Sequence, residues 1–159
     1  MPIDRTTLRM DPDEFDRMMG EQRTLRAATV SPDGWPHVVP LWFVWHDGAV
    51  WVTSLRKSRR ARDLAAGSKV ALCIDTGTEY AELRGAVLYG TFGEAADHHE
   101  LPAARRMLGR KYWSIDDVPE LKSHVWLRLV PDRIVSWDFR KMPDGGDRRT
   151  ATIREKRDA

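Results

Sequence analysis

Residues 31–54 read SPDGWPHVVPLWFVWHDGAVWVTS and contain the clearest fold signal in the chain. A Pro-Asp-Gly turn signature stands at residues 32–34, and an Asp-Gly pair at residues 47–48 divides two apolar segments, 35–45 and 49–54. Asp-Gly favours a tight hairpin turn because glycine accepts a positive φ without steric cost. The pattern therefore predicts two antiparallel strands joined by this turn.

Short apolar stretches bounded by turn residues continue on both sides of the hairpin. They are RTLRAATV (23–30), KVALCID (69–75), AELRGAVLYGTFGEA (81–95), HVWLRLV (124–130) and DRIVSWD (132–138). Many short strands leave edges that must be covered, and closing the sheet into a barrel covers them. We therefore expect a mainly β fold of the α+β class, in which six or seven antiparallel strands form a barrel decorated by a few short helices.

Three segments carry helix signals; they are 11–20, 58–68 and 94–113. The first has Asp11 as its N-cap and Gly20 as its end, and the second is opened by Ser58 and closed by Gly67. Within the third, Pro102 is expected to bend or split the helix, because proline removes a backbone donor.

The 159 residues fit one domain, residues 1–141, followed by a polar tail, 142–159. The single cysteine, Cys73, lies in an apolar run, so we expect neither a disulfide framework nor a zinc site. The charged N-terminus lacks the order of a signal peptide, and no apolar run approaches the roughly 20 residues that span a bilayer. We therefore expect a cytoplasmic protein without a membrane partner.

Positive charge is concentrated in TSLRKSRRAR, residues 53–62, where a strand ends and a helix begins. Residues 51–70 carry six Lys/Arg against one Asp/Glu, whereas residues 1–50 carry five against eight. Short hydroxyls and bidentate guanidinium groups at such a junction favour a phosphate site. The candidate ligands are Thr53, Ser54, Ser58, Arg59 and Arg60. A solvated helix start remains the alternative, and nucleic acid is not expected because the tryptophans lie elsewhere.

These motifs together resemble the split β-barrel proteins of the pyridoxamine 5′-phosphate oxidase-like superfamily over residues 20–141. The DG-x-P-H-x-x-P motif of the superfamily is matched by Asp33, Gly34, Pro36, His37 and Pro40. Its Thr-initiated phosphate loop, which ends in Ser-Arg-Lys, is matched by Thr53, Ser58, Arg59 and Arg60, with arginine in the place of lysine. Within the superfamily, the chain is most similar to the actinobacterial flavin/deazaflavin oxidoreductases.

The resemblance implies a homodimer in which the cofactor lies in a groove between two subunits. The loop motif would hold the phosphate, and the ring would be bordered by His37, Pro40, Leu41 and Trp42. Trp137 and Arg140, at the end of the last strand, would reach the cofactor groove of the other subunit. A barrel-capping role for Trp137 remains the alternative.

The resemblance also implies that the chemistry resides in the cofactor, and no residue is assigned as catalytic. True pyridoxamine phosphate oxidases carry cations in the strand that corresponds to HVVPLWF (37–43), which has none. This difference favours coenzyme F420 over FMN, with Arg56, Lys57 and Arg62 near its anionic tail. The expected function is reduction of a small organic substrate by hydride transfer from F420. An FMN-binding oxidase-like enzyme and a non-catalytic carrier of F420 or flavin remain the alternatives, and the substrate stays open.

His98, His99 and Tyr80 are residue types that often occur in functional sites. His98 and His99 would point about 100° apart on the third helix, so they are not expected to chelate one metal ion. Tyr80 begins the long segment after TGT and resembles a tyrosine near the active site in related proteins, but a core tyrosine is an equal alternative.

Overall fold

The computed structural model describes residues 6–65, 67–116 and 118–142. Its strands are β1 (Thr24–Val30), β2 (Pro36–Trp42), β3 (Val44–His46), β4 (Ala49–Leu55), β5 (Lys69–Thr76), β6 (Arg84–Thr91), β7 (Gly93–Glu94), β8 (His124–Leu129) and β9 (Arg133–Asp138). The helices are α1 (Pro12–Glu21), α2 (Arg59–Ala65) and α3 (Leu101–Trp113), with 3₁₀ turns η1 (Tyr80–Glu82) and η2 (Phe139–Lys141). None of these helices has the length and apolar character needed to span a bilayer.

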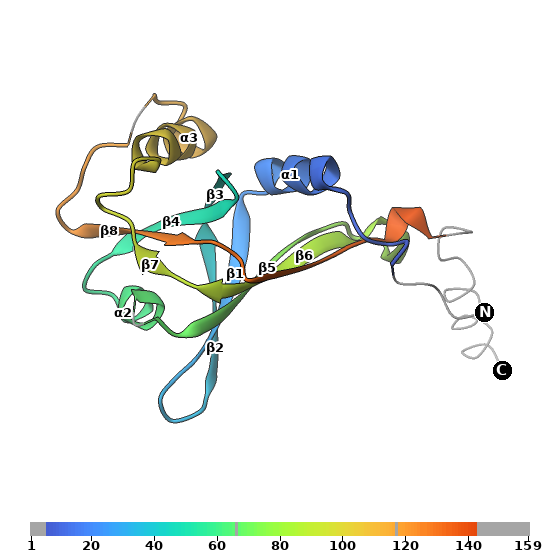
Figure 1. Cartoon of the computed structure of the whole chain (residues 1–159), viewed down its shortest axis with the longest axis horizontal. Helices are drawn as coiled ribbons and strands as arrows, with labels where there is room; N and C mark the ends of the chain where they lie inside the picture. The colour runs from blue at the N-terminus through green and yellow to red at the C-terminus, as the bar shows by residue number, and fades with distance from the viewer. Residues whose placement is uncertain (1–5, 66, 117, 143–159) are drawn as a thin grey trace.

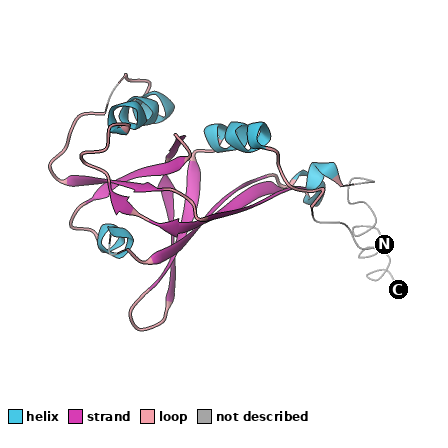
Figure 2. Cartoon of the chain, in the orientation of Figure 1, coloured by secondary structure: helices cyan, strands magenta, loops and turns pink. Residues whose placement is uncertain are grey.

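The strands form two antiparallel sheets, in the orders β2-β1-β5-β6-β9 and β3-β4-β8-β7 (Figures 1 and 2). The main core lies between them, where strand residues such as Leu25, Val52, Leu72 and Leu127 are fully buried. Residues from α1 join the same core. This arrangement confirms the mainly β, split-barrel class.

The structure has nine strands among the described residues, so the expected six or seven is too few. The apolar run 35–45 breaks at Phe43, which is fully buried. The Phe43 amide donates to the Tyr112 hydroxyl at 3.0 Å, and that hydroxyl lies 2.8 Å from the Phe43 carbonyl oxygen, which can accept its proton. A side chain from α3 thus replaces ladder bonds at this point. The chain crosses here from the five-stranded sheet to the four-stranded one.

The hairpin predicted from Asp47 and Gly48 is confirmed. Both residues have positive φ, 51° and 64°, and β3 pairs with β4 in the register Trp45↔Val50. These dihedral angles match the turn geometry that suits the right-handed twist of a hairpin. The turn at residues 32–34 joins β1 to β2, and there only Gly34 has a positive φ, 86°.

The first two helices begin as expected, but one predicted end is wrong. Asp11 and Glu14 form a capping box at the start of α1, whereas Gly20 lies inside the helix and Gln22 is its C-cap. The Ser58 hydroxyl accepts a hydrogen bond from the Ala61 amide at 3.1 Å and so caps α2.

The predicted start of the third helix is also wrong. Residues 94–100 form the end of β7 and two turns, and α3 begins only at Leu101. Pro102 therefore lies in the first turn, where its missing N–H needs no partner, and it does not bend the helix. His98 and His99 consequently precede α3, and Tyr80 lies in η1 ahead of the strand that it was expected to begin.

The two sheets differ in what covers their outer faces. Over the four-stranded sheet, α3 buries Trp51, Ala104 and Leu108 in a second apolar cluster. Alternate residues of β1, β2, β5, β6 and β9 point away from the main core. At the edge of this face the Trp42 ring stacks on Tyr112 of α3, with the ring centres 4.5 Å apart. Much of the predicted tail falls outside the described residues, which end at Met142.

Candidate functional site

The junction of β4 and α2 brings two hydroxyls and one guanidinium together. Ser54 is only 2% exposed, and its Oγ lies 3.3 Å from the Oγ of Ser58. The Arg60 Nε donates to the Ser54 Oγ at 3.0 Å. Strand β4 thus aims Ser54 inward, and the first turn of α2 returns Arg60 onto it.

Arg60 is held by one nitrogen and keeps the others available. Its Nε is engaged by Ser54, and its terminal Nη groups make no hydrogen bond or ion pair with a residue that the structure describes. The two Nη groups of a guanidinium form a fork that matches two oxygens of a phosphate. A positioned arginine of this kind can clamp an anion without a large loss of side-chain entropy.

Three other cations of the basic block make contacts at the surface. Arg59 pairs with Asp63 at 3.5 Å, and Arg62 donates to the backbone oxygen of Lys57 at 3.3 Å. Arg56 lies 3.7 Å from the Glu94 carboxylate. Exposed pairs such as these contribute little to stability, so they can open for a ligand at small cost.

Strand β2 divides its predicted site residues between two faces. His37 and Leu41 lie on the face that carries the core, and Leu41 is buried within it. Pro40 and Trp42 alternate with them and lie on the outer face. The Leu41 side chain cannot border a cofactor ring from inside the core, so only its backbone remains for that role.

The turn between β1 and β2 lies within electrostatic reach of α2. A hydrogen bond from the Ser31 hydroxyl is the largest cause that lowers the pKa of Asp33, and the Arg59 guanidinium lowers it further. The turn that precedes β2 and the start of α2 therefore flank one region. His37, Ser54, Ser58, Arg59 and Arg60 are the predicted site residues on elements around it.

Three predicted site residues lie elsewhere in the chain. Thr53 points to the face of β4 opposite to Ser54, where it lines a different pocket. Trp137 lies near the end of β9, and Arg140 lies in η2, which follows it. In Figure 1 the orange end of the described chain lies on the opposite side of the molecule from α2. Within one chain, the structure does not bring Trp137 and Arg140 to the phosphate loop, and it turns the Thr53 side chain away from Ser54.

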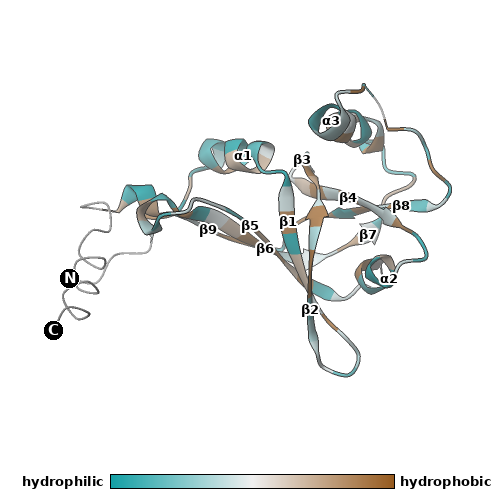
Figure 3. Cartoon of the chain, turned by 180° about the vertical axis from the view of Figure 1, so that it is seen from behind, coloured by the Kyte–Doolittle hydropathy of each residue, from teal (hydrophilic) through white to brown (hydrophobic). Residues whose placement is uncertain are grey.

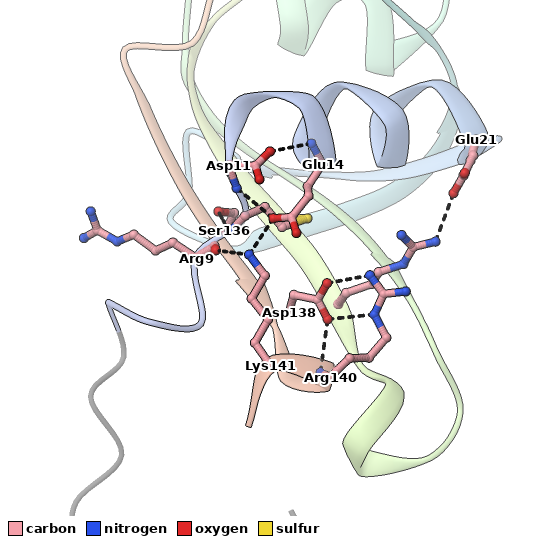
Figure 4. Close-up of polar contacts among 10 residues, drawn as sticks. Arg9, Asp11, Glu14, Glu21, Ser136, Asp138, Arg140 and Lys141 are labelled. Carbon is pink, nitrogen blue, oxygen red and sulfur yellow. Dashed lines mark hydrogen bonds and ion pairs between the residues drawn. The ribbon is translucent and has the colours of Figure 1, made fainter. Parts of the chain in front are cut away.

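Arg140 belongs to a polar cluster that ties α1 to the end of β9 (Figure 4). Its guanidinium bonds both oxygens of Asp138, at 2.8 and 2.5 Å, and Asp138 is 1% exposed. This hydrogen-bonded pair lowers the pKa of Asp138. Lys141 pairs with Glu14 beside it, so these contacts give Arg140 a structural partner within its own chain.

Lys122 and Ser123 were missed from the sequence. Together with Arg56, Lys57 and Ser58 they line a pocket of about 360 Å³ at the end of β4. They lie at least 60 positions along the chain from the basic block, and no sequence motif marks them. Only the pairing of β4 with β8, which places Leu55 opposite His124, brings them to this edge.

The histidines near α3 do not form a metal site among the described residues. The rings of His98 and His99 stack with their centres 4.6 Å apart, and His98 also meets the Trp51 ring edge-on. Glu100 accepts from His46 at 2.7 Å. Each of these contacts is accounted for by packing or by an ion pair.

The family model described as pyridoxamine 5′-phosphate oxidase matches residues 11–138. None of the curated proteins compared matches the chain.

Among solved structures, the conserved hypothetical protein Rv2991 from Mycobacterium tuberculosis is 25% identical, with a TM-score of 0.76 over 89% of this chain and 94% of that one. The FAD and heme binding protein from Mycobacterium smegmatis is 22% identical, with a TM-score of 0.69 over 89% and 78%. The FAD binding protein from the same organism is 16% identical, with a TM-score of 0.63 over 80% and 95%. The last two support the fold alone.

Proposed function

Because the chain belongs to the pyridoxamine 5′-phosphate oxidase family, we propose that it binds a phosphate-bearing flavin or deazaflavin and acts as an oxidoreductase. The finer proposal is that coenzyme F420 is the cofactor and that a small organic substrate is reduced by hydride transfer. The observation that carries the proposal is Arg60, which Ser54 fixes through one nitrogen while both Nη groups have no partner among the described residues.

The residues that would hold the cofactor follow from this arrangement. Arg60 would clamp the phosphate, with the Ser58 hydroxyl and the exposed Arg59 beside it. His37 and the backbone of residues 40–42 would border the ring. When bound, the cofactor supplies the hydride, and the protein binds, orients and shields it from water.

The choice between cofactors depends on charge. Strand β2 carries no Lys or Arg, which removes a second clamp for a terminal phosphate monoester and favours the phosphodiester of F420. Arg62 lies on the exposed side of α2, where it suits an anionic tail. Arg56 and Lys57 instead line a pocket at the edge of the outer face, so we assign them a smaller part in cofactor binding. A flavin remains the second candidate because two of the neighbours are named as FAD-binding proteins.

We also propose that the functional unit is a homodimer formed through the outer face of the five-stranded sheet. Val38 and Val135 are exposed on this face, and Val135 shares a register row with Val87 and Cys73. The same face carries an exposed ion pair between Arg26 and Asp75 at 2.6 Å. In Figure 3 the hydrophobic colour is concentrated in the strands. Trp137 shares this face with Val135, so a partner seated on it would meet Trp137. Exposed apolar side chains gathered on one sheet face are typical of an association site.

A spectrum of protein purified from a host that makes both cofactors tests the proposal first. A deazaflavin absorption band supports F420, and flavin bands support FMN or FAD. If neither band is seen, the decision rests on titration with added cofactor. FMN, FAD and F420 are then titrated by fluorescence against the parent protein, Arg60→Ala and Arg56→Ala, at low and high salt. Loss of one charge-assisted contact to phosphate costs about 1.5–3 kcal/mol, so we expect Arg60→Ala to weaken binding roughly tenfold to more than a hundredfold.

The matched control is Arg56→Ala, because it removes the same charge from the same block at an exposed position. We expect it to cost less than threefold. Equal losses for both variants that disappear at high salt would show only a diffuse electrostatic surface. Binding without oxidation of reduced F420 by any substrate offered would favour the carrier. A parent protein that binds none of the three cofactors would refute the proposal.

A further inference from the structure

The outer face of the four-stranded sheet carries two adjoining pockets beyond the part that α3 covers. The first, called the tryptophan pocket, has a volume of about 420 Å³ and is lined chiefly by Thr53, Trp113, Ile115, Leu121, His124 and Trp126. The second, called the lysine pocket, is the one of about 360 Å³ at the end of β4. Volumes of this size suit small organic molecules.

The walls of the tryptophan pocket are apolar and uncovered. Trp113, Ile115 and Leu121 remain 48%, 41% and 51% exposed, although all three border the same pocket. The floor is formed by the cross-strand pair Thr53 and Trp126. Two indole rings around one space favour a planar aromatic ligand, because aromatic rings gain from stacked or edge-on contact as well as from burial.

The tryptophan pocket contains few polar groups, and one of them, His124, is held by a neighbouring hydroxyl. Among its lining residues, only Thr53 and His124 carry polar side-chain atoms besides the indole N–H groups. The Ser123 hydroxyl lies 3.1 Å from Nδ1 of His124, which leaves Nε2 for another partner. A largely apolar pocket with a small number of fixed polar groups is typical of a ligand site.

The lysine pocket adds positive charge at one end. Lys57 and Lys122 both line it, and neither ammonium forms an ion pair with a residue in the described ranges. Arg56 adds a third cation, although Glu94 lies 3.7 Å away. Three cations around one small space favour an anionic group.

The two pockets adjoin along one segment of chain. Leu121 and His124 line the tryptophan pocket, whereas Lys122 and Ser123 between them line the lysine pocket. Across the sheet, Leu55 of the lysine pocket pairs with His124. Directly paired residues lie about 5 Å apart, so a molecule the size of a substituted aromatic ring system can reach both.

We propose that the two pockets form one binding site for an aromatic organic acid, with the ring in the tryptophan pocket and the acid group in the lysine pocket. The site is separate from the cofactor groove, because Thr53 and Leu55 point to the face of β4 opposite to Ser54. Ser58 is the one lining residue that also belongs to the hydroxyl cluster around Arg60.

Calorimetric titration of the full chain with 2-naphthoate and its uncharged analogue 2-naphthamide tests the proposal. We expect Lys122→Glu to weaken 2-naphthoate binding at least tenfold and to leave 2-naphthamide within twofold, because only the acid meets the cations. Leu121→Asp should weaken both at least tenfold and leave cofactor affinity unchanged. The controls are Lys69→Glu and Val130→Asp, which alter an exposed lysine and an exposed valine outside both pockets.

Three results would overturn the proposal. The parent protein could show no binding of 2-naphthoate up to millimolar concentration. The control variants could lower the affinity as much as the pocket variants, or Arg60→Ala could abolish it, which would place the probe in the cofactor groove. Leu121→Asp could convert a parent dimer to a monomer in light scattering, which would make the pocket an interface between copies of the chain.

Discussion

Replacing Lys111 by methionine should stabilise the protein at neutral pH. Lys111 lies on α3, and its Nζ is buried without a hydrogen-bond partner among the described residues. The nitrogen lies 4.4 Å from the centre of the Phe43 ring. Burial, with a smaller contribution from the Arg23 charge, lowers the pKa of Lys111 from 10.5 to about 8. The folded protein therefore holds this proton less tightly than the unfolded chain does.

The sign of the pH dependence follows from linkage. Between pH 8 and 10.5 the unfolded chain binds more protons at this lysine, so its contribution to stability rises with pH in that range. Each tenfold change in proton affinity is worth about 1.4 kcal/mol, which makes the full penalty below pH 8 roughly 3 kcal/mol. The cation–π contact with Phe43 is worth about 1 kcal/mol and is lost on substitution. We expect Lys111→Met to be more stable by roughly 1–3 kcal/mol at pH 7.

Urea unfolding followed by tryptophan fluorescence at pH 7, 8, 9 and 9.5 measures this difference at one protein concentration. The advantage of the variant should shrink by roughly 2 kcal/mol between pH 7 and 9.5. Burial raises the pKa of Tyr112, which titrates only at higher pH, so the range ends before it interferes. Lys69→Met is the control for an exposed lysine. A stability difference that does not change with pH would refute the reasoning.

Two further predictions concern packing and assembly. A Cβ added at Gly85 would lie 2.6 Å from a Trp137 ring carbon and 2.7 Å from the Ile74 carbonyl oxygen, so Gly85→Ala should cost about 1–3 kcal/mol in urea unfolding. Gly93→Ala, which meets nothing within 4 Å, should stay within about 0.5 kcal/mol, and equal costs would contradict the packing argument. Light scattering at micromolar concentration should find a dimer for the parent and for Val130→Asp but a monomer for Val135→Asp, and a monomeric parent would contradict the proposed interface.

Local chemistry explains which parts of the fold could be predicted from the sequence. The hairpin at Asp47 and Gly48 depends on two neighbouring residues whose turn preference is strong, and it is confirmed. The predicted start of α3 was wrong because Pro102 fits two structures equally well. It can kink the middle of a longer helix, or it can lie in the first turn of a shorter one. In the structure, where Pro102 lies in the first turn, Ala104 and Leu108 are buried against Trp51. The sequence around Pro102 does not show this contact with a distant strand.

The division of the strands between two sheets depends on long-range contacts that the sequence does not show. Tyr112 meets Phe43 across 69 positions, and that contact breaks the apolar run. The same limit applies to the candidate site: the basic block could be found by its charge, but Lys122 joins it only through the pairing of β4 with β8. The roles of Trp137 and Arg140 in the groove of a partner subunit remain predictions. In their own chain they lie in β9 and η2, away from the basic block.

The alternation of β4 accounts for both proposed sites with one short segment. Consecutive residues of a strand point to opposite faces, so Ser54 turns inward toward Arg60 while Thr53 faces Trp126 on the outside. The cations that follow β4 also lie on opposite sides. Lys57, before α2, lines the outer pocket, whereas Arg60, in α2, donates to Ser54. One basic segment can thus bind two anions on opposite faces of the sheet. A single phosphate site would not need cations on both faces.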